Sequence, residues 1–316
     1  IWIVDNSGSM READGHRIVD DMMGNANSIR FVDCTRWEEI RSTVEYHMQL
    51  ASLIKAPTRF RMLNPARDFE TAGGLITELS IGMNGDLPFE ADDKMAQIRR
   101  IQPEGSTPLT QHMREIREEL IAMAPELRQT GQRVSIVIAT DGLPTNETGQ
   151  GGDFEKRRFV EALRLLEGLP VWLVIRLCTD EDDVVDFYND LDHMLELSID
   201  VLDDFTAEAK EIYEVNPWIN YALPLHRIRE FGTPERLFDL IDERAFTRSE
   251  VQSYCNILFS TSSMDGAPDA AADWKGFLVI VSKLSKSEGD RWNPVKRRRK
   301  QLISVKKLGG RRGFCS

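Results

Sequence analysis

Short apolar runs alternate with longer amphipathic stretches over the first two thirds of the chain. Short runs rich in Val, Ile and Leu are typical of strands, whereas apolar residues three or four positions apart are typical of helices. Regular alternation of the two predicts a mostly parallel sheet that helices cover on both faces. The strands that we predict are Ile1 to Val4, Thr58 to Leu63, Gly74 to Ile81, Val134 to Ala139, Pro170 to Leu177 and Leu195 to Val201.

Two of these strands have the pattern of central strands. The runs that begin at Val134 and Val171 are nearly continuous in β-branched and other apolar residues, as in strands buried on both faces. The stretch Gly74 to Ile81 alternates more weakly and follows a Gly pair, which predicts an edge strand or part of a hairpin. The helices that we predict between the strands are Trp37 to Ile54, Leu109 to Leu127 and Phe154 to Leu166.

After residue 204 the pattern is mostly helical. Thr247 and Glu250 have the spacing of a capping box, and a later apolar run, Phe277 to Val281, predicts a strand. The helices that we predict here are Thr206 to Tyr213, Pro234 to Asp242 and Ser249 to Phe259. We therefore expect a sheet domain over residues 1–204, a helical extension over 205–262, and a short strand with a basic C-terminal tail over 263–316.

The composition is that of a soluble globular protein, with 41% hydrophobic and 29% charged residues among 316. No apolar run approaches the roughly 20 residues of a membrane span, so we predict a chain without one. The four cysteines are too scattered for a disulfide framework or a cysteine-based zinc site, which favours a reducing, cytoplasmic or nuclear location. Because the sequence begins inside a predicted core strand and without a Met, we also expect that upstream residues, including any targeting segment, are missing.

The charge is unevenly distributed along the chain. From residue 283 onward there are twelve Lys and Arg but only Glu288 and Asp290, so this segment carries +10 and the net charge of −12 leaves −22 for the first 282 residues. The basic stretch Lys296 to Lys300 is either a solvated tail, a nuclear-import signal, a nucleic-acid contact or, with residues up to 312, a docking strip for an acidic partner. The overall negative charge argues against nucleic acid as the main ligand.

The residues that carry chemistry follow the first predicted strand. Asp5, Ser7 and Ser9 place a carboxylate and two hydroxyls at alternate positions, and Gly8 permits a tight turn between them. Such oxygens can converge on a hard cation, although the same residue types also form ordinary turns and helix caps. Both interpretations remain open for this segment alone.

Two further segments favour the cation site. Asp141 follows the predicted strand Val134 to Ala139, and Thr107 lies in a loop that opens a long predicted helix. In open α/β sheets, ligands bind outside the carboxyl ends of the strands, where the winding direction switches. We expect Asp5, Thr107 and Asp141 to meet there if the first and fourth predicted strands are neighbours.

The set Asp5-x-Ser7-x-Ser9, Thr107 and Asp141 resembles the metal-ion-dependent adhesion site of von Willebrand factor type A domains. The resemblance covers roughly residues 1 to 204 and includes each position of the motif. It implies a Rossmann-like, open, mostly parallel sheet with helices on both faces and one Mg²⁺ ion. In the family pattern, Ser7, Ser9 and Thr107 would bind the ion through their hydroxyls, and Asp5 and Asp141 would bind it directly or through water.

The donor types suit the ion that the resemblance implies. Mg²⁺ prefers octahedral oxygen coordination with one or two carboxylates and several waters; Mn²⁺ could replace it, and Ca²⁺ would prefer more ligands. Two carboxylates cancel the charge of the ion, so the metal can still accept another carboxylate, which in the family is a Glu or Asp of a partner protein. The resemblance therefore implies a binding module without catalytic residues. Intracellular members of the family serve as subunits or scaffolds of larger assemblies, and we expect that role here.

Other interpretations compete with this one. The acidic stretch Thr179 to Asp183 could form a second metal site, but acids in a first helical turn are the commoner explanation. His112 lies close to Thr107 in sequence and is expected to be structural or solvent-facing, and no nucleophile or general base stands out. Two alternatives remain open: a Mg²⁺-dependent hydrolase or phosphotransferase, and a structural assembly component whose metal site is not functional.

Overall fold

The structure is a computed structural model that describes residues 1–20, 29–68, 74–83, 90–179, 181–202, 204–233 and 235–310. The chain divides into two compact units. The first unit comprises Ile1–Val19, Arg30–Asp203 and Glu230–Thr233. The second comprises Asp20–Ile29, Asp204–Arg229 and Pro234–Ser316.

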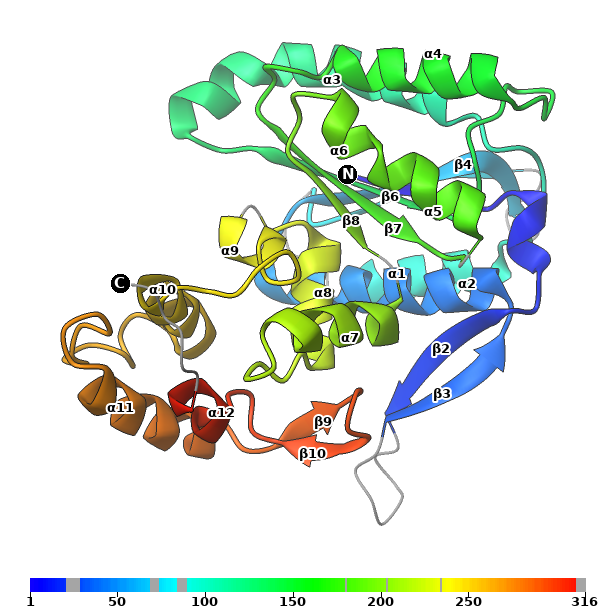
Figure 1. Cartoon of the computed structure of the whole chain (residues 1–316). Coiled ribbons are helices and arrows are strands. Elements are labelled where there is room, and N and C mark those ends of the chain that lie inside the picture. Colours follow the sequence, from blue (N-terminus) through cyan, green and yellow to red (C-terminus); the bar gives the residue numbers. More distant parts are fainter. Residues whose placement is uncertain are drawn as a thin grey trace. The chain divides into compact units, whose positions relative to one another are not determined.

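The first unit is built on a six-stranded sheet in the order β5-β4-β1-β6-β7-β8 (Figure 1). Strand β5 is an antiparallel edge strand, and the other five are parallel. This confirms the prediction of a mostly parallel sheet in an α/β fold and of an edge strand at Gly74–Ile81. The strands are β1 (Trp2–Val4), β4 (Thr58–Asp68), β5 (Gly74–Ile81), β6 (Val134–Thr140), β7 (Val171–Leu177) and β8 (Ile199–Leu202).

Two strand boundaries differ from the predicted ones. Strand β4 extends to Asp68, past an irregularity in its pairing with β5 between Arg61 and Ala66. Strand β8 begins at Ile199, four residues after the predicted start at Leu195, because helix α6 (Leu191–Met194) extends to that point and Leu195 is its C-cap. The apolar side chain of Leu195 is buried, so the sequence pattern could not separate it from the strand.

Helices cover both faces of the sheet (Figure 1). Trp2 and Val4 of β1 pack in one core with α1 (Arg36–Ile54) and α2 (Glu90–Arg100). Ile3 points to the opposite core, which contains the buried faces of α3 (Leu109–Thr130), α4 (Asp153–Arg164) and α5 (Asp182–Asn189). The predicted helices over 37–54, 109–127 and 154–166 are therefore confirmed within a few residues of their bounds.

The connection from β1 to α1 contains structure that the sequence pattern did not predict. The short helix η1 (Gly8–Arg11) is followed by β2 (Gly15–Asp20) and β3 (Ile29–Cys34), which form a separate two-stranded sheet. Helix α1 then begins with a capping box, in which Thr35 and Glu38 accept each other's backbone N–H groups. This cap places Arg36 in the first turn of the helix.

The second unit is mostly helical and includes one small hairpin. Helix α9 is shorter than the predicted helix over 234–242, and Pro234 lies outside the described residues. The capping box of Thr247 and Glu250 is confirmed. The elements are α7 (Phe205–Val215), α8 (Leu223–Phe231, whose last two residues belong to the first unit), α9 (Arg236–Asp239), α10 (Arg248–Phe259), α11 (Trp274–Ser287), β9 (Arg291–Asn293), β10 (Arg298–Lys300) and α12 (Val305–Gly309).

The prediction of a strand over Phe277 to Val281 was wrong, because these residues form the middle of α11. Asp273 caps this helix by accepting the N–H of Gly276 at 2.9 Å. Phe277 and Val281 are buried four positions apart, whereas Val279 is 67% exposed, which is the pattern of one buried helix face. A short, continuous apolar run does not distinguish a strand from a buried helix segment.

The basic C-terminal stretch is also folded over most of its length. Lys296 and Arg297 lie in the turn of the β9–β10 hairpin, Arg298 to Lys300 form β10, and Lys306 and Lys307 lie in α12. The residues from 311 onward lie outside the described part of the chain. Among the described residues, no helix is both long and apolar enough to cross a membrane.

Candidate metal centre at the carboxyl edge of the sheet

The sheet changes its winding direction between β1 and β6. From β1 the chain adds β4 and β5 on one side, and it then crosses over to add β6, β7 and β8 on the other side. Asp5 directly follows β1 and Asp141 directly follows β6, and the N–H of Asp5 donates to the Ala139 carbonyl at 2.9 Å. The two carboxylates therefore lie at the switch point, where open α/β sheets bind ligands.

Asp5 is fully buried and is held by two short hydrogen bonds. Its Oδ1 accepts the N–H of Ser7 at 2.8 Å, and its Oδ2 accepts the hydroxyl of Thr140 at 2.6 Å. One bond comes from its own loop and the other from the end of β6. The carboxylate is thus fixed in position between the two neighbouring strands.

The serine hydroxyls connect the first loop to Asp141. Ser7 Oγ and Ser9 Oγ lie 3.1 Å apart, and Ser9 Oγ donates to Oδ1 of Asp141 at 2.9 Å. Ser7 and Asp141 are buried, whereas Ser9 is exposed. Three of the predicted ligands therefore form one continuous series, whose middle member, Ser9, reaches the protein surface.

Thr107 joins this group from the loop before α3. Its N–H donates to Thr145 Oγ1 at 2.9 Å, and its carbonyl accepts the N–H of Thr145 at 3.0 Å. A Cβ placed on Gly142 would lie 4.0 Å from Thr107 Oγ1, so this hydroxyl lies beside the residue that follows Asp141. Thr107 is 6% exposed.

A second layer of polar contacts locks the loops together. Asn6 exchanges two hydrogen bonds with the backbone of Asn64, at 2.8 and 2.9 Å, and Asn64 Nδ2 donates to the carbonyl of Ser106 at 2.7 Å. The N–H of Gly8 also donates to the carbonyl of Gly105 at 3.1 Å. The loops that carry Asp5 and Thr107 are therefore positioned by their neighbours before any ligand is present.

The electrostatics of the pair favour a cation. Burial, and then the nearby charge of Asp141, raise the pKa of Asp5 to about 6. Burial also raises the pKa of Asp141. Two carboxylates in such a site repel each other and lack water, so a positive ion between them is a natural complement.

One cation is already supplied by the protein, and the sequence pattern did not identify it. Arg36 is 5% exposed and donates from Nη1 to Asp141 Oδ2 at 3.1 Å. Its other nitrogens contact Asp14 at 2.7 Å and Glu181 at 3.0 Å. Arg36 lies 105 positions from Asp141 in the sequence, so only the fold reveals the pair.

The acidic stretch Thr179 to Asp183 has the structure of a helix start. Asp182 and Asp183 lie in the first turn of α5, and the carboxylate of Glu181 accepts a hydrogen bond from Arg36. Asp180 lies outside the described residues. His112 bonds the carbonyl of Leu63 through Nε2 at 3.0 Å, and burial lowers its pKa, as expected for a neutral packing residue.

The donor set is compatible with one Mg²⁺ ion. Among the described residues there is no group of three or more His, Cys, Asp or Glu that could hold a metal. The candidate ligands are of a different kind, because they combine two carboxylates with three hydroxyls. Each carboxylate oxygen has two lone pairs, so Asp5 and Asp141 could still contact an ion or its waters while keeping their present partners.

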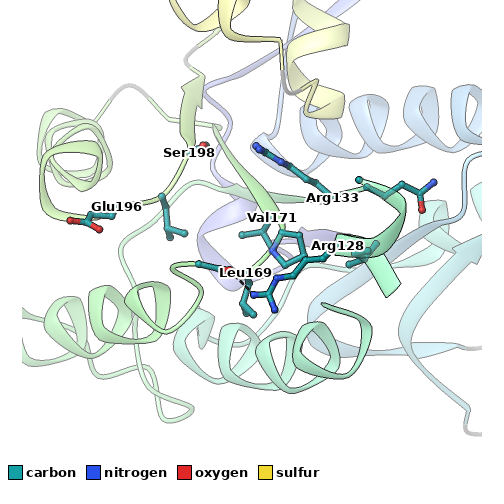
Figure 2. Close-up of a pocket in the computed structure, with 12 residues that line it drawn as sticks. Arg128, Arg133, Leu169, Val171, Glu196 and Ser198 are labelled. Atoms are coloured by element: carbon teal, nitrogen blue, oxygen red, sulfur yellow. Dashed lines mark hydrogen bonds between the residues drawn. The ribbon is translucent and has the colours of Figure 1, made fainter. Parts of the chain in front are cut away.

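A separate pocket of about 430 Å³ lies at the opposite edge of the same sheet (Figure 2). It is lined by the segments that precede β6, β7 and β8, including Arg133, Val171 and Ser198. Arg128 contributes one wall and donates to the carbonyl of Gly168 at 2.9 Å. None of the five predicted site residues lines this pocket.

Comparisons with known proteins do not identify a family. No protein-family model matches the chain, and no curated protein matches it. One similar solved structure is the D319A mutant of the PilB minor pilin from Streptococcus sanguinis, with 11% sequence identity and a TM-score of 0.37. The match covers 64% of this chain and 56% of the pilin chain, so this chain spans a little over half of that protein.

Proposed function

We propose that the first unit is a von Willebrand factor type A domain that binds one Mg²⁺ ion through Asp5, Ser7, Ser9, Thr107 and Asp141. The ion serves binding and not catalysis: it accepts a Glu or Asp of a partner protein. The chain then acts as a subunit or scaffold of an assembly inside the cell, in the cytoplasm or nucleus. Cys34, Cys178 and Cys255 are free thiols, as expected in such a compartment.

The observation that carries the proposal is the series of contacts from Ser7 through Ser9 to Asp141, beside the buried Asp5. Hydroxyl and carboxylate oxygens are the donors that Mg²⁺ prefers. Ser9, in the middle of the series, is its exposed member, so a partner side chain can approach at this residue. The sheet topology adds support, because the group lies at the switch point.

Arg36 limits the negative charge around the candidate site. Two carboxylates and one divalent ion are neutral together, and the guanidinium on Asp141 contributes one further positive charge. Asp14 and Glu181 also pair with this guanidinium, at 2.7 and 3.0 Å, so the whole group carries −1. An acidic partner would therefore be bound through an open coordination position of the ion and not through the local net charge.

Isothermal titration of Mg²⁺ into chelator-treated protein tests the proposal. The wild type should bind about one ion, and Asp5→Asn and Thr107→Ala should each lose most of the affinity while remaining folded. Ser106→Ala is the matched control, because Ser106 precedes Thr107 but bonds the carbonyl of Glu147. A wild-type protein that is folded and binds neither Mg²⁺ nor Mn²⁺ would overturn the metal site.

The partner is tested separately by affinity capture in Mg²⁺ and in chelator. We expect a protein that is retained only with the metal and is lost with Asp5→Asn. A partner retained equally in chelator would support a second candidate function, a structural component in which Arg36 permanently replaces the metal charge. The contact of Arg36 with Asp141 is the observation that favours this candidate.

A further inference from the structure

The second unit contains a pocket of about 310 Å³ that is rich in positive charge. It is formed by the end of α7, the segment after it, the β9–β10 hairpin and the start of α12. This size is near the lower end of the range for small-molecule sites. The cationic side chains that line it are Lys296, Arg299, Lys300 and Lys307.

Two of the lysines converge on one aromatic ring. The Nζ atoms of Lys296 and Lys307 lie 4.4 and 4.1 Å from the ring centroid of Tyr213. Lys307 Nζ also donates to the Tyr213 hydroxyl at 2.8 Å and to the carbonyl of Pro217 at 2.9 Å. The hydrogen bonds from Lys307 and Lys296 lower the pKa of Tyr213 to about 8, which reflects the positive potential at this point.

The positive charge of the pocket is not compensated within it. Asp290 is the acidic residue that lines it, and Arg299 contacts its backbone carbonyl, at 2.6 Å, and not its carboxylate. None of the four cations forms an ion pair with a carboxylate of the described residues, in contrast to the paired arginines of the first unit. Four cations and one acid leave +3 in a chain whose net charge is −12. Such a concentration of like charge attracts anions.

The frame that holds the cations is rigid. Asn293 Nδ2 donates to Asn220 Oδ1 at 2.8 Å, and Asn220 Nδ2 donates to the carbonyl of Lys300 at 3.1 Å. Both asparagines are nearly fully buried, and Arg299 pairs with Trp292 across the hairpin. The backbone that carries Arg299 and Lys300 is therefore fixed, so binding an anion would order only their side chains.

We propose that this pocket binds a small molecule that carries two or more phosphate groups. Phosphate oxygens accept charge-assisted hydrogen bonds from several Lys and Arg at once, and Arg299 can engage one group through two nitrogens. Gln301 and Ser304 line the same pocket and offer neutral polar groups to the ligand. The site is independent of the metal centre, because its residues all belong to the second unit.

A concave pocket fits a small ligand better than a nucleic acid. The Tyr213 ring is occupied by two ammonium groups and is not free to stack on a base. Trp218, which also lines the pocket, is 1% exposed. The net negative charge of the chain further opposes a long polyanion.

Titration calorimetry at 150 mM salt with inositol hexakisphosphate as the probe tests the proposal on the full chain. The wild type should bind about one molecule, and the double variant Lys296→Gln, Lys307→Gln should bind about tenfold or more weakly, since two charge-assisted contacts are lost. The matched control is Lys283→Gln, Lys286→Gln, which removes the same charge from exposed positions on α11 outside the pocket. It should change the affinity less than about twofold.

Further binding experiments distinguish whether the phosphate groups belong to a lipid headgroup or to a nucleotide. Phosphatidylcholine vesicles with phosphatidylinositol 4,5-bisphosphate should bind in the same variant-dependent way if a lipid headgroup is the natural source, and ATP should compete if a nucleotide is. Unfolding curves establish that each variant is folded, and Arg299→Gln provides an independent variant. Equal weakening by the control pair, no binding by the wild type, or binding of a single-stranded RNA oligonucleotide alone would each overturn the proposal.

Discussion

Arg36 and Asp141 form a buried ion pair, in which Nη1 donates to Oδ2 at 3.1 Å. The arginine comes from the first turn of α1 and the aspartate from the end of β6. The pair neutralises one of the two carboxylates of the candidate metal centre before any ion binds. It also holds the Asp141 side chain so that its other oxygen, Oδ1, faces Ser9. The Arg36–Asp141 pair therefore couples the metal centre to the stability of the first unit.

Arg36→Met should destabilise the metal-free protein by about 3 kcal/mol at pH 7.5, because it leaves a buried carboxylate without its partner. The loss should be smaller at pH 5, where Asp141, whose pKa burial already raises, can take up a proton. Denaturant unfolding at the two pH values measures this difference. Arg41→Met is the control on the same helix: its 3.8 Å contact with Glu45 joins two partly exposed side chains and should contribute less than about 1 kcal/mol. Equal losses for both variants would contradict the prediction.

The metal-free protein should lose stability as the pH rises from about 4 to about 6. Asp5 keeps its proton to about pH 6 in the folded state, whereas an unfolded Asp releases it near its ordinary value of 3.8. The folded state thus binds more protons in this window, and the free energy of unfolding falls with pH, by up to about 3 kcal/mol.

Mg²⁺ should counteract the loss of stability that the metal-free protein shows as the pH rises. It competes with the proton for Asp5, so its stabilising effect should be larger at pH 7.5 than at pH 5, and about 2.7 kcal/mol when its concentration is a hundredfold above Kd. Melting temperatures in Mg²⁺ and in chelator at pH 5, 6 and 7.5 provide the measurement. An increase in Tm of the same size at all three values would show that the ion does not bind at Asp5.

Gly105→Ala should weaken Mg²⁺ binding about tenfold, because the loop that carries Thr107 depends on this glycine. Gly105 has φ +99, and an added Cβ would lie 2.4 Å from Oδ1 of Asn64, which is itself held by Ser106. Gly131→Ala is the matched control for a positive φ. It has a similar positive φ of +67 at the end of α3, but nothing lies within 4 Å of an added Cβ. Gly131→Ala should lose about 1 kcal/mol of stability and Gly105→Ala more, because of its contact with Asn64, and only Gly105→Ala should lose metal affinity. If the two bind Mg²⁺ equally well, the loop does not position a ligand.

The elements that were predicted correctly are those that local pattern determines. Strand β6 is a nearly continuous apolar run, and helix α1 is long, with apolar residues at helical spacing. The run Phe277 to Val281 failed because five apolar residues contain too little periodicity to distinguish a helix from a strand. Strands β2 and β3 were missed because charged residues interrupt their apolar ones, and because they form a two-stranded sheet apart from the main one.

The same distinction between local pattern and long-range contact applies to the residues of the candidate site. Asp5, Ser7 and Ser9 are close in sequence, and Asp141 could be added because it ends a recognisable strand. Arg36 could not be predicted, since its partners Asp14, Asp141 and Glu181 meet only in the folded chain. The basic pocket around Tyr213 was hidden for the same reason, because its cations come from a hairpin and a helix that the pattern had assigned to a tail.

Asn216 should be among the most important polar residues of the second unit. Its side chain is fully buried and makes four hydrogen bonds: Nδ2 donates to the carbonyls of Ile241 and Arg244, both at 2.8 Å, and Oδ1 accepts from Trp218 and Phe246, both at 3.2 Å. Asn216→Ala would leave these buried partners without a bond, so we expect a loss of about 3 kcal/mol in denaturant unfolding.

Asn216→Asp should cost still more, since it replaces the donor with a charged oxygen that faces two carbonyls. Asn256→Ala, at a half-buried position of α10, is the control and should cost less than about 1 kcal/mol. Mg²⁺ affinity should be unchanged in all three variants, because Asn216 and Asn256 belong to the second unit and the metal ligands to the first. A loss of Mg²⁺ binding in folded Asn216→Ala would show instead that the two units are energetically coupled.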